Sequence, residues 1–322
     1  MQRFSTVSSS VPERSLSNIE IGKVVETSDE WIRTRTGIEN RRITDEKTGV
    51  VELSCEAAKK ALEQKNIDPS TIDLVILASS TQDDLFGSAG EIQGKIGAIN
   101  AAAFDITAAC SGFTISLITA TQFINNGIYK TVLIIGADVL SKWVDWYDRT
   151  TCILFGDAAG AVVMQRSDKN FLLSSKIQTD GQQNKQLMLK CKTKLVNNEL
   201  QLYNRNYSFV QMNGREVYKF AISRLPQAIE ECLKIGGISI DNIDWLLLHQ
   251  ANKRILSAIA DKLGLEEYKV INNLEKYGNT SAASIPLALD ESVSEGKIKR
   301  KDKIIIAGFG AGFTWSVLIV EW

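Results

Sequence analysis

The sequence has 322 residues, of which 44% are hydrophobic and 23% are charged, and its formal net charge is −1. This balance is typical of a soluble globular protein with an ample core, and the near-zero charge indicates neither a nucleic-acid partner nor an anionic membrane surface. No apolar run approaches the length of a membrane span, and the first residues do not read as a secretory signal.

Helix-like and strand-like segments alternate along the first half of the chain. Residues 53–62 place their apolar side chains on one helical stripe, and residues 73–80 form the continuous apolar run of a strand covered on both faces. Helical spacing returns at 113–124, and two more buried strands are predicted at 131–140 and 158–166. The alternation predicts an α/β fold with a mostly parallel sheet.

The second half repeats the first. A helical segment at 216–233 leads into 238–250, which overlays 67–79 at a constant offset of 171 residues. The apolar run at 304–308 matches 132–136 at an offset of 172. Such self-similarity indicates two related halves whose equivalent loops converge near a pseudo-twofold axis.

We therefore predict two units, residues 1–170 and residues 171–322. The closing strand at 313–322 is the counterpart of the strand at 158–166. Residues 167–215 are more polar and lack a strong period, so we interpret them as the connection between the halves together with surface hairpins.

Cys110 lies at the predicted turn between a strand and the helix at 113–124. It is one of five cysteines, none in a C-x-x-C pair, so neither a zinc site nor a disulfide framework is predicted and a reducing compartment is favoured. The amides and positive dipole end of the following helix favour a thiolate, and small neighbours leave room for a carbonyl to approach the sulfur. The alternative is a small core residue, since free cysteines are often buried.

Two further polar residues lie at equivalent places in the second half. His249, the only histidine, ends a predicted strand, and ligands in open α/β sheets bind outside the carboxyl ends of strands. Asn279 lies in a turn that starts a helix, and Cys110 falls on Ala282 of that same segment at an offset of 172. Alone, each could be structural, as a buried histidine or a turn amide. Together they predict a thiol, an imidazole and an amide in one site.

Six motifs follow one another along the chain: TSDEWIRTRTGI (27–38), FDITAACSGF (104–113), FGDAAGA (155–161), LHQANKRI (248–255), GNTSAAS (278–284) and GFGAGFTW (308–315). With them the sequence resembles the β-ketoacyl-acyl carrier protein synthase III family of the thiolase-like superfamily over nearly its whole length. The resemblance implies a five-layer αβαβα fold, a homodimer, and the first condensation of fatty-acid synthesis. In that reaction an acetyl group carried by coenzyme A is joined to malonyl-acyl carrier protein.

The resemblance also implies catalytic roles. Cys110 would store the acyl group as a thioester, while His249 and Asn279 would donate hydrogen bonds to the enolate left when malonyl loses CO2. The backbone N–H groups of Cys110 and Ala311 would hold the tetrahedral oxyanion. No metal and no cofactor are implied, because the coenzyme A thioester is a substrate.

Binding residues follow from matching positions. The coenzyme A contacts would be Thr27, Trp31, Arg35, Arg149 and Asn252. The carrier-protein contacts would be Gln250, Ala251, Asn252, Lys253 and Arg254, with Lys219 and Lys262 as helpers. Phe86 would close the acyl pocket across the dimer interface, which argues for a short primer.

Some residues depart from the family pattern. Gly87 replaces a common proline, Asp261 stands where a basic residue is frequent, and serines replace glycines in the first strand. The sequence GFGAG at 308–312 favours a resemblance to cyanobacterial or plastid members of the family. We therefore expect the protein in the bacterial cytoplasm or the plastid stroma. Other classes are disfavoured. Thiolases use a second cysteine near the carboxyl end and elongating synthases use a second histidine, and this sequence has neither. The motifs disfavour a Cys-His-Asn protease, and the three reactive residues disfavour a non-catalytic binding module.

Overall fold

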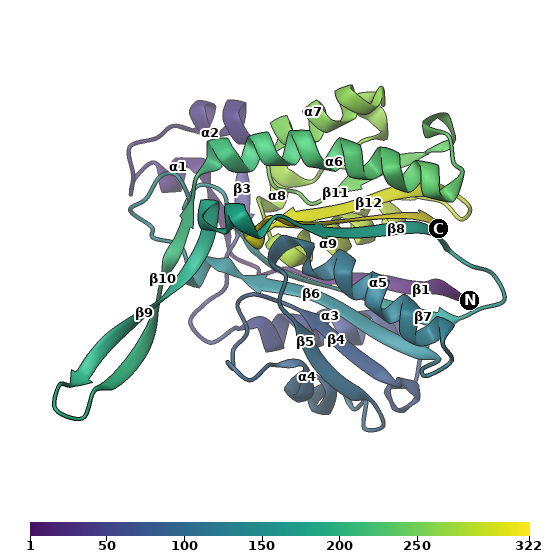
Figure 1. Cartoon of the computed structure of the whole chain (residues 1–322), viewed down its shortest axis with the longest axis horizontal. Helices are drawn as coiled ribbons and strands as arrows, with labels where there is room; N and C mark the ends of the chain where they lie inside the picture. Colours follow the sequence, from purple (N-terminus) through teal and green to yellow (C-terminus); the bar gives the residue numbers. More distant parts are fainter.

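The computed structural model describes residues 1–322 as five layers, in which two sheets alternate with three layers of helices (Figure 1). The first sheet orders its strands β1-β7-β6-β4-β5. These strands are β1 (Gln2–Ser10), β4 (Leu74–Ala78), β5 (Ala102–Ile106), β6 (Thr131–Val139) and β7 (Asp157–Arg166). The three strands predicted in this half are confirmed as β4, β6 and β7, and they are buried almost throughout because helices cover both faces of the sheet.

The helices of the first half lie on both sides of this sheet. On the outer side α3 (Val50–Glu63) and α4 (Ala89–Ile96) pack together, and α5 (Gly112–Asn125) lies on the inner side against β4 and β6. Both predicted helices, at 53–62 and 113–124, are confirmed as α3 and α5. The apolar stripe of α3 is buried in the outer core, as its helical spacing requires.

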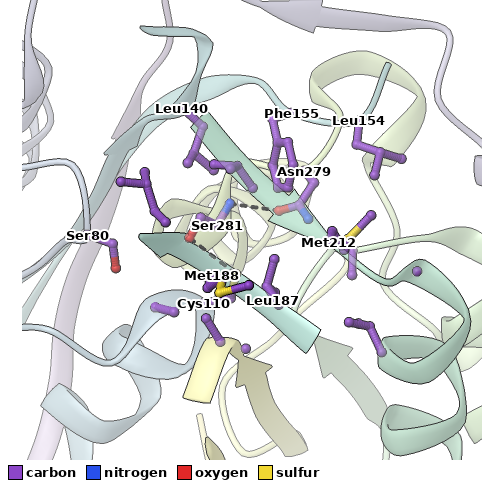
Figure 2. Close-up of a pocket in the computed structure, with 18 of the residues that line it drawn as sticks. Ser80, Cys110, Leu140, Leu154, Phe155, Leu187, Met188, Met212, Asn279 and Ser281 are labelled. Carbon is purple, nitrogen blue, oxygen red and sulfur yellow. Dashed lines mark hydrogen bonds between the residues drawn. The ribbon is translucent and has the colours of Figure 1, made fainter. Parts of the chain in front are cut away.

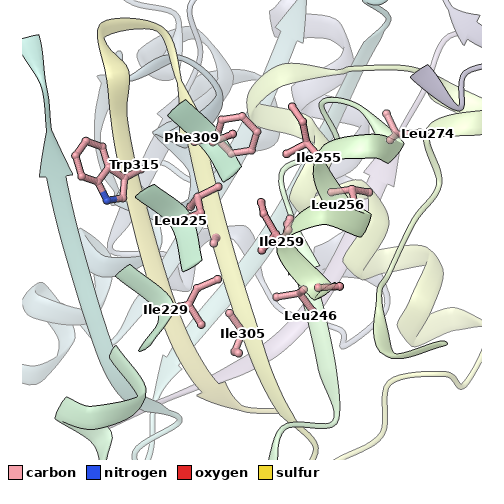
Figure 3. Close-up of a cluster of buried hydrophobic side chains, with 14 of the residues drawn as sticks. Leu225, Ile229, Leu246, Ile255, Leu256, Ile259, Leu274, Ile305, Phe309 and Trp315 are labelled. Atoms are coloured by element: carbon pink, nitrogen blue, oxygen red, sulfur yellow. The ribbon is translucent and has the colours of Figure 1, made fainter. Parts of the chain in front are cut away.

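The second sheet orders its strands β11-β12-β13-β8. They are β8 (Leu172–Thr179), β11 (Trp245–Leu248), β12 (Lys303–Gly310) and β13 (Thr314–Glu321), with α6 (Gly214–Gly236) and α7 (Lys253–Leu263) outside. Leu225 of α6 and Ile259 of α7 pack with Ile305 of β12 in the outer core of this half (Figure 3). The helix α9 (Ser284–Ser294) joins α5 in the layer between the two sheets.

The two sheets share one topology, which confirms the predicted fold class of two related halves. In the first, β6 runs parallel to β4 and antiparallel to β7. In the second, β12 runs parallel to β11 and antiparallel to β13. The prediction of a mostly parallel sheet is wrong, because β7 and β13 each pair antiparallel with both neighbours. A single parallel bridge between Leu246 and Val270 stands where the first sheet has β5. The boundary between residues 170 and 171 stays a prediction.

The same offset relates the turns that precede the two central helices. The 3₁₀ turn η2 (Ala109–Ser111) leads into α5, and η7 (Ser281–Ala283) leads into α9. Each turn begins with a non-glycine residue of positive φ, 48° at Ala109 and 51° at Ser281. Because few side chains adopt this conformation without cost, its recurrence shows that both turns are held by their surroundings.

Residues 167–215 contain more structure than the sequence predicts. The strand β8 completes the second sheet by pairing with β13, so this part of the connection belongs to the core. The predicted surface hairpin is present as β9 (Leu187–Asn197) and β10 (Leu202–Met212), which project from the body of the molecule (Figure 1). The remaining short elements are β2 (Ser15–Ser17), α1 (Asn18–Ile21), α2 (Asp29–Thr36), β3 (Asn40–Arg42) and α8 (Leu274–Tyr277). No helix combines the length and apolar character needed to cross a membrane.

Candidate active site

A cavity of about 1660 Å³ opens where the two halves meet the base of the β9–β10 hairpin. Its wall includes Cys110, His249 and Asn279, which reach it from η2, the end of β11 and the segment before η7. The duplication places these residues at corresponding sheet ends, and the structure brings all three to one cavity. The hairpin adds apolar wall, including Leu187, Met188 and Met212 (Figure 2).

Cys110 is held at the amino end of α5 by close backbone packing. A Cβ atom at Gly310 would lie 2.8 Å from the Cys110 backbone nitrogen, so only glycine lets the end of β12 pass this close. The residue is 7% exposed, and its Sγ lies 3.2 Å from the hydroxyl of Ser281 on the mirrored turn (Figure 2). The nucleophile candidate of one half therefore touches the turn of the other.

The expected thiolate is not favoured in the resting site. Burial, with a smaller contribution from the carboxylate of Asp138, raises the pKa of the Cys110 thiol to about 12, while the Ser281 hydroxyl acts in the opposite direction. The helix end supplies only partial charges, whereas the buried sulfur has lost its water and has no cation beside it. Cys110 therefore rests as a neutral thiol.

His249 is oriented by the start of α9. It is 2% exposed, and its Nδ1 lies 2.7 Å from the Ser284 hydroxyl, which also accepts the Gln250 backbone N–H at 3.3 Å. With that N–H donated to it, the hydroxyl is free to give its own proton to Nδ1, and this arrangement leaves the ring proton on Nε2. Burial lowers the pKa of His249 to about 3, so the ring is neutral and retains a single N–H donor.

Asn279 has one end of its amide fixed and the other free. Its backbone N–H donates to the Leu154 carbonyl at 2.9 Å, and its carbonyl accepts from Gly156 at 3.0 Å. Its side-chain Oδ1 accepts the Ser281 N–H at 2.9 Å (Figure 2). With its oxygen engaged, the Nδ2 group is left to donate into the cavity.

An aromatic–cation cluster marks the outer part of the cavity. The guanidinium carbons of Arg35 and Arg149 lie 5.3 and 5.8 Å from the centre of the Trp31 ring, and all three residues line the cavity. Asn252, also on the wall, caps α7 and donates to the Arg35 carbonyl at 3.1 Å. Thr27 lies outside the wall, with its hydroxyl buried and unpartnered.

The predicted carrier-protein residues separate into two groups. Lys253 and Arg254 are exposed at the start of α7, and Ala251 and Arg254 line the cavity. Gln250 contradicts its assignment: it is fully buried, and its side-chain amide donates to the Leu248 and Ile271 carbonyls at 2.7 and 3.2 Å. The chain turns inward after β11, so this side chain cannot reach a docked protein.

The helper residues and the acyl-pocket residue lie on the surface. Lys219 is paired with Glu216, and the Lys262 ammonium donates to the Ile222 carbonyl. Phe86 is 98% exposed and does not line the cavity of its own chain. Ala311 lies on the cavity wall beside Gly310, on the side of the Cys110 backbone.

Sequence reasoning missed three residues that hold the site. Ser281 and Ser284 fall inside the GNTSAAS motif, and their place on a turn equivalent to 109–112 was the signal that could have found them. Asp138 lies next to the last residue of the apolar strand β6, is fully buried, and acts on the Cys110 thiol through its charge. A lone carboxylate at the end of a buried strand was the corresponding signal. No group of His, Cys, Asp or Glu side chains is arranged to bind a metal ion.

The chain folds as two related halves in five layers, and their loops meet at a thiol, an imidazole and an amide. This arrangement defines a thiolase-like fold. The family described as 3-oxoacyl-[acyl-carrier-protein (ACP)] synthase III matches residues 104–181, and its C-terminal part matches residues 233–322. The chain belongs to this family.

Relatives extend the match to nearly the whole chain. The β-ketoacyl-[acyl-carrier-protein] synthase III of Microcystis aeruginosa is 52% identical over 317 residues, 98% of this chain and 95% of that protein. The enzyme of the same name from Porphyra purpurea is 50% identical over 329 residues, covering 98% and 97%. The crystal structure of 3-oxoacyl-[acyl-carrier-protein] synthase III from Aquifex aeolicus VF5 is 40% identical, superposes with a TM-score of 0.92 and covers 100% of both chains.

Proposed function

We propose that this chain is the condensing enzyme that starts fatty-acid synthesis, converting acetyl-coenzyme A and malonyl-acyl carrier protein to acetoacetyl-acyl carrier protein, coenzyme A and CO2. The observation that carries the proposal is the meeting of Cys110, His249 and Asn279 on one cavity in a chain matching its relatives almost end to end. Those relatives are named for this synthase activity.

In the first step the Cys110 sulfur attacks the acetyl thioester carbon. A new C–S bond forms, the bond to the coenzyme A sulfur breaks, and the thiol proton of Cys110 ends on the departing coenzyme A. Because the resting thiol is neutral, this proton has to move as the sulfur attacks. The backbone N–H groups of Cys110 and Ala311 are proposed to hold the oxyanion.

In the second step malonyl-acyl carrier protein loses CO2, and its electron pair becomes an enolate. The Nε2–H of His249 and the Nδ2–H of Asn279 donate to the enolate oxygen, a task that needs neutral donors rather than a strong base. The carbanion then attacks the acyl carbonyl, the bond to Cys110 breaks, and the sulfur takes a proton from solvent. Acetyl-coenzyme A is consumed as a substrate and coenzyme A is released as a product, so no step uses a separate cofactor.

The outer cavity fits a nucleotide-bearing substrate. A planar base can lie against the Trp31 ring, with Arg35 and Arg149 supplying positive charge for phosphate groups, and Asn252 faces the path inward. Thr27 is proposed at the nucleotide end. Carrier protein is proposed to dock on Lys253 and Arg254, beside Ala251 and near Lys219 and Lys262, whose positive charges favour an acidic partner.

A second copy of the chain is proposed to pair along β5. This strand ends the first sheet, its outer edge has no partner strand, and Phe104 on it is exposed. Leu85 and Phe86, which are 78% and 98% exposed, add apolar surface. Phe86 would then enter the partner's cavity, where a ring limits the primer length. The relatives come from cyanobacteria and from Porphyra purpurea, which supports a location in bacterial cytoplasm or plastid stroma.

The proposal is tested by intact mass after incubation with acyl-coenzyme A species of increasing chain length. We expect an acetyl adduct on Cys110, none in Cys110→Ala, and less adduct as the chain grows. Decarboxylation of malonyl-acyl carrier protein is measured separately in His249→Ala and Asn279→Ala, where a loss of about 10²–10³-fold is expected with acetylation of Cys110 retained. Loss of acetylation with decarboxylation spared in His249→Ala would overturn the assigned roles.

A further inference from the structure

Asp138 is a buried carboxylate that none of the steps above uses. It lies at the carboxyl end of β6 and is fully buried. One oxygen accepts the Ser80 N–H at 2.9 Å and the Thr81 hydroxyl at 2.8 Å, with the Ser79 hydroxyl at 3.3 Å. The other oxygen accepts the Ala282 N–H at 3.1 Å. Burial raises the pKa of Asp138, and these donated hydrogen bonds oppose that effect, because an ionised carboxylate only accepts.

Through Ala282 the carboxylate fixes the turn η7 on the first sheet. A Cβ atom at Gly136, on the same strand, would lie 2.3 Å from the Ala282 carbonyl oxygen, so the turn rests directly on the β6 backbone. Ser281, next to Ala282, has its left-handed φ of 51° and places its hydroxyl 3.2 Å from the Cys110 sulfur. The conformation that brings this hydroxyl to the sulfur is strained, and the bond from Ala282 to Asp138 is one of those that maintain it.

The charges around Cys110 give this arrangement a second effect. Asp138 is the charged group whose field reaches the thiol, and it disfavours a second negative charge there. The imidazole of His249 is neutral and provides no counter-charge. The Ser281 hydroxyl acts in the opposite sense, since it stabilises the thiolate by a hydrogen bond.

We propose that Asp138 is a positioning residue, whose carboxylate holds the Ser281 hydroxyl against the Cys110 sulfur and disfavours a negative charge there. The nucleophile is thereby controlled from both halves: β6 supplies the charge and η7 supplies the hydroxyl. The inference rests on the proposed function only in taking Cys110 as the nucleophile.

The test is the rate of Cys110 alkylation by iodoacetamide in the free enzyme at about pH 8, followed at the peptide that carries residue 110. Asp138→Asn removes the charge, so we expect alkylation to become about tenfold faster. Ser281→Ala removes the hydroxyl, so alkylation should become slower. A purely structural role would not move the two variants in opposite directions.

Asp157 provides a matched control. It is also fully buried at a strand end, where it accepts the Ser141 N–H and the Thr44 N–H at 2.9 and 2.8 Å, but it does not act on the Cys110 thiol. Asp157→Asn should lose comparable stability without changing the alkylation rate. An equal change of rate in Asp138→Asn and Asp157→Asn would overturn the inference. If Asp138→Asn does not fold, unchanged or faster alkylation in Ser281→Ala would overturn it instead. Alkylation requires no condensation, so neither result bears on the proposed reaction.

Discussion

The turns 109–112 and 281–284 have the same backbone path and different chemistry. Both begin with a left-handed residue, both pass through a 3₁₀ turn, and both lead into a central helix. Where the first carries Cys110, the second carries Ala282, whose amide is bound to Asp138. Where the first carries Gly112, the second carries Ser284, which orients His249.

The difference shows how one fold unit serves two purposes. The first turn presents a reactive atom to the cavity, and the second supplies the groups that hold and orient the reactive atoms. Neither half contains a complete site, because the Cys110 sulfur touches Ser281 across the pseudo-twofold axis. Exchanging residues between equivalent positions therefore tests which features belong to the shared backbone and which to the side chains.

The largest effect is expected when the nucleophile moves to the mirrored turn. The double variant Cys110→Ala/Ala282→Cys keeps the number of cysteines, but position 282 is 1% exposed and does not line the cavity. Condensation should fall by about 10³-fold or more, as in Cys110→Ala alone. Steady-state rates and intact mass measure this, and an acyl adduct at position 282 would contradict it.

The second prediction compares His249 with Ala78, its counterpart at an offset of 171. The pKa of the buried ring is about 3, below its ordinary value of 6.5. Above pH 6.5 the ring is neutral in folded and unfolded chains alike. Between pH 6.5 and 3 only the unfolded chain binds the proton, so the free energy of unfolding falls by about 1.4 kcal/mol per pH unit.

His249→Ala removes the proton-binding group that causes this fall. Between pH 6.5 and 4.5 the free energy of unfolding of the variant should therefore fall by about 2–3 kcal/mol less than that of the parent. Urea unfolding at the two pH values measures the difference. An identical acid sensitivity of parent and variant would show that the ring is not held neutral by burial.

A smaller effect is expected when the second turn is made to resemble the first by Ser284→Gly. The hydroxyl that fixes the His249 ring is lost, while Cys110 and Ser281 keep their contact. Decarboxylation should fall about tenfold, the equivalent of one hydrogen bond, with acetylation little changed. The control is Ser116→Gly, since this buried serine of α5 bonds only to the Gly112 carbonyl of its own helix. Equal losses in both variants would reduce the role of Ser284 to helix stability.

The smallest effect concerns the strained residue that begins the first turn. Ala109→Gly relieves a left-handed alanine at a cost in chain entropy, and the balance should raise the free energy of unfolding by about 0.5 kcal/mol. Ala283→Gly is the matched control, because residue 283 of the mirrored turn has a φ of −77° and a ψ of −17° in the ordinary helical region. Thermal unfolding should rank the first variant above the second, and the reverse order would show that Ala109 is not strained.

The sequence predicted those parts of the site that depend on local pattern and on the duplication. Apolar runs located β4, β6 and β11. The carboxyl end of β11 located the imidazole, and the turn before the helix at 113–124 located the thiol. Whether a side chain beyond such an end turns outward or inward depends on tertiary contacts. Gln250 and Arg254 belong to one motif, yet the first caps the carbonyls of Leu248 and Ile271 inside the core and the second is exposed.

The protonation state of Cys110 was outside the reach of sequence for a similar reason. The helix end that favours a thiolate is visible in the sequence, whereas the burial and the carboxylate that oppose it are not. Asp138 gathers donors from residues 79–81 and from Ala282, which lies 144 positions away in the chain. Only folding shows that these segments share one carboxylate.

The glycine beneath the second turn has a consequence for how this enzyme can be silenced. At position 136 a single methyl group would wedge the Ala282 carbonyl away from the sheet and carry the Ser281 hydroxyl off the sulfur. Gly136 does not touch a substrate, yet it sets the spacing between β6 and the turn η7. Gly136→Ala would therefore misalign the reaction centre, although every reacting group would still be present.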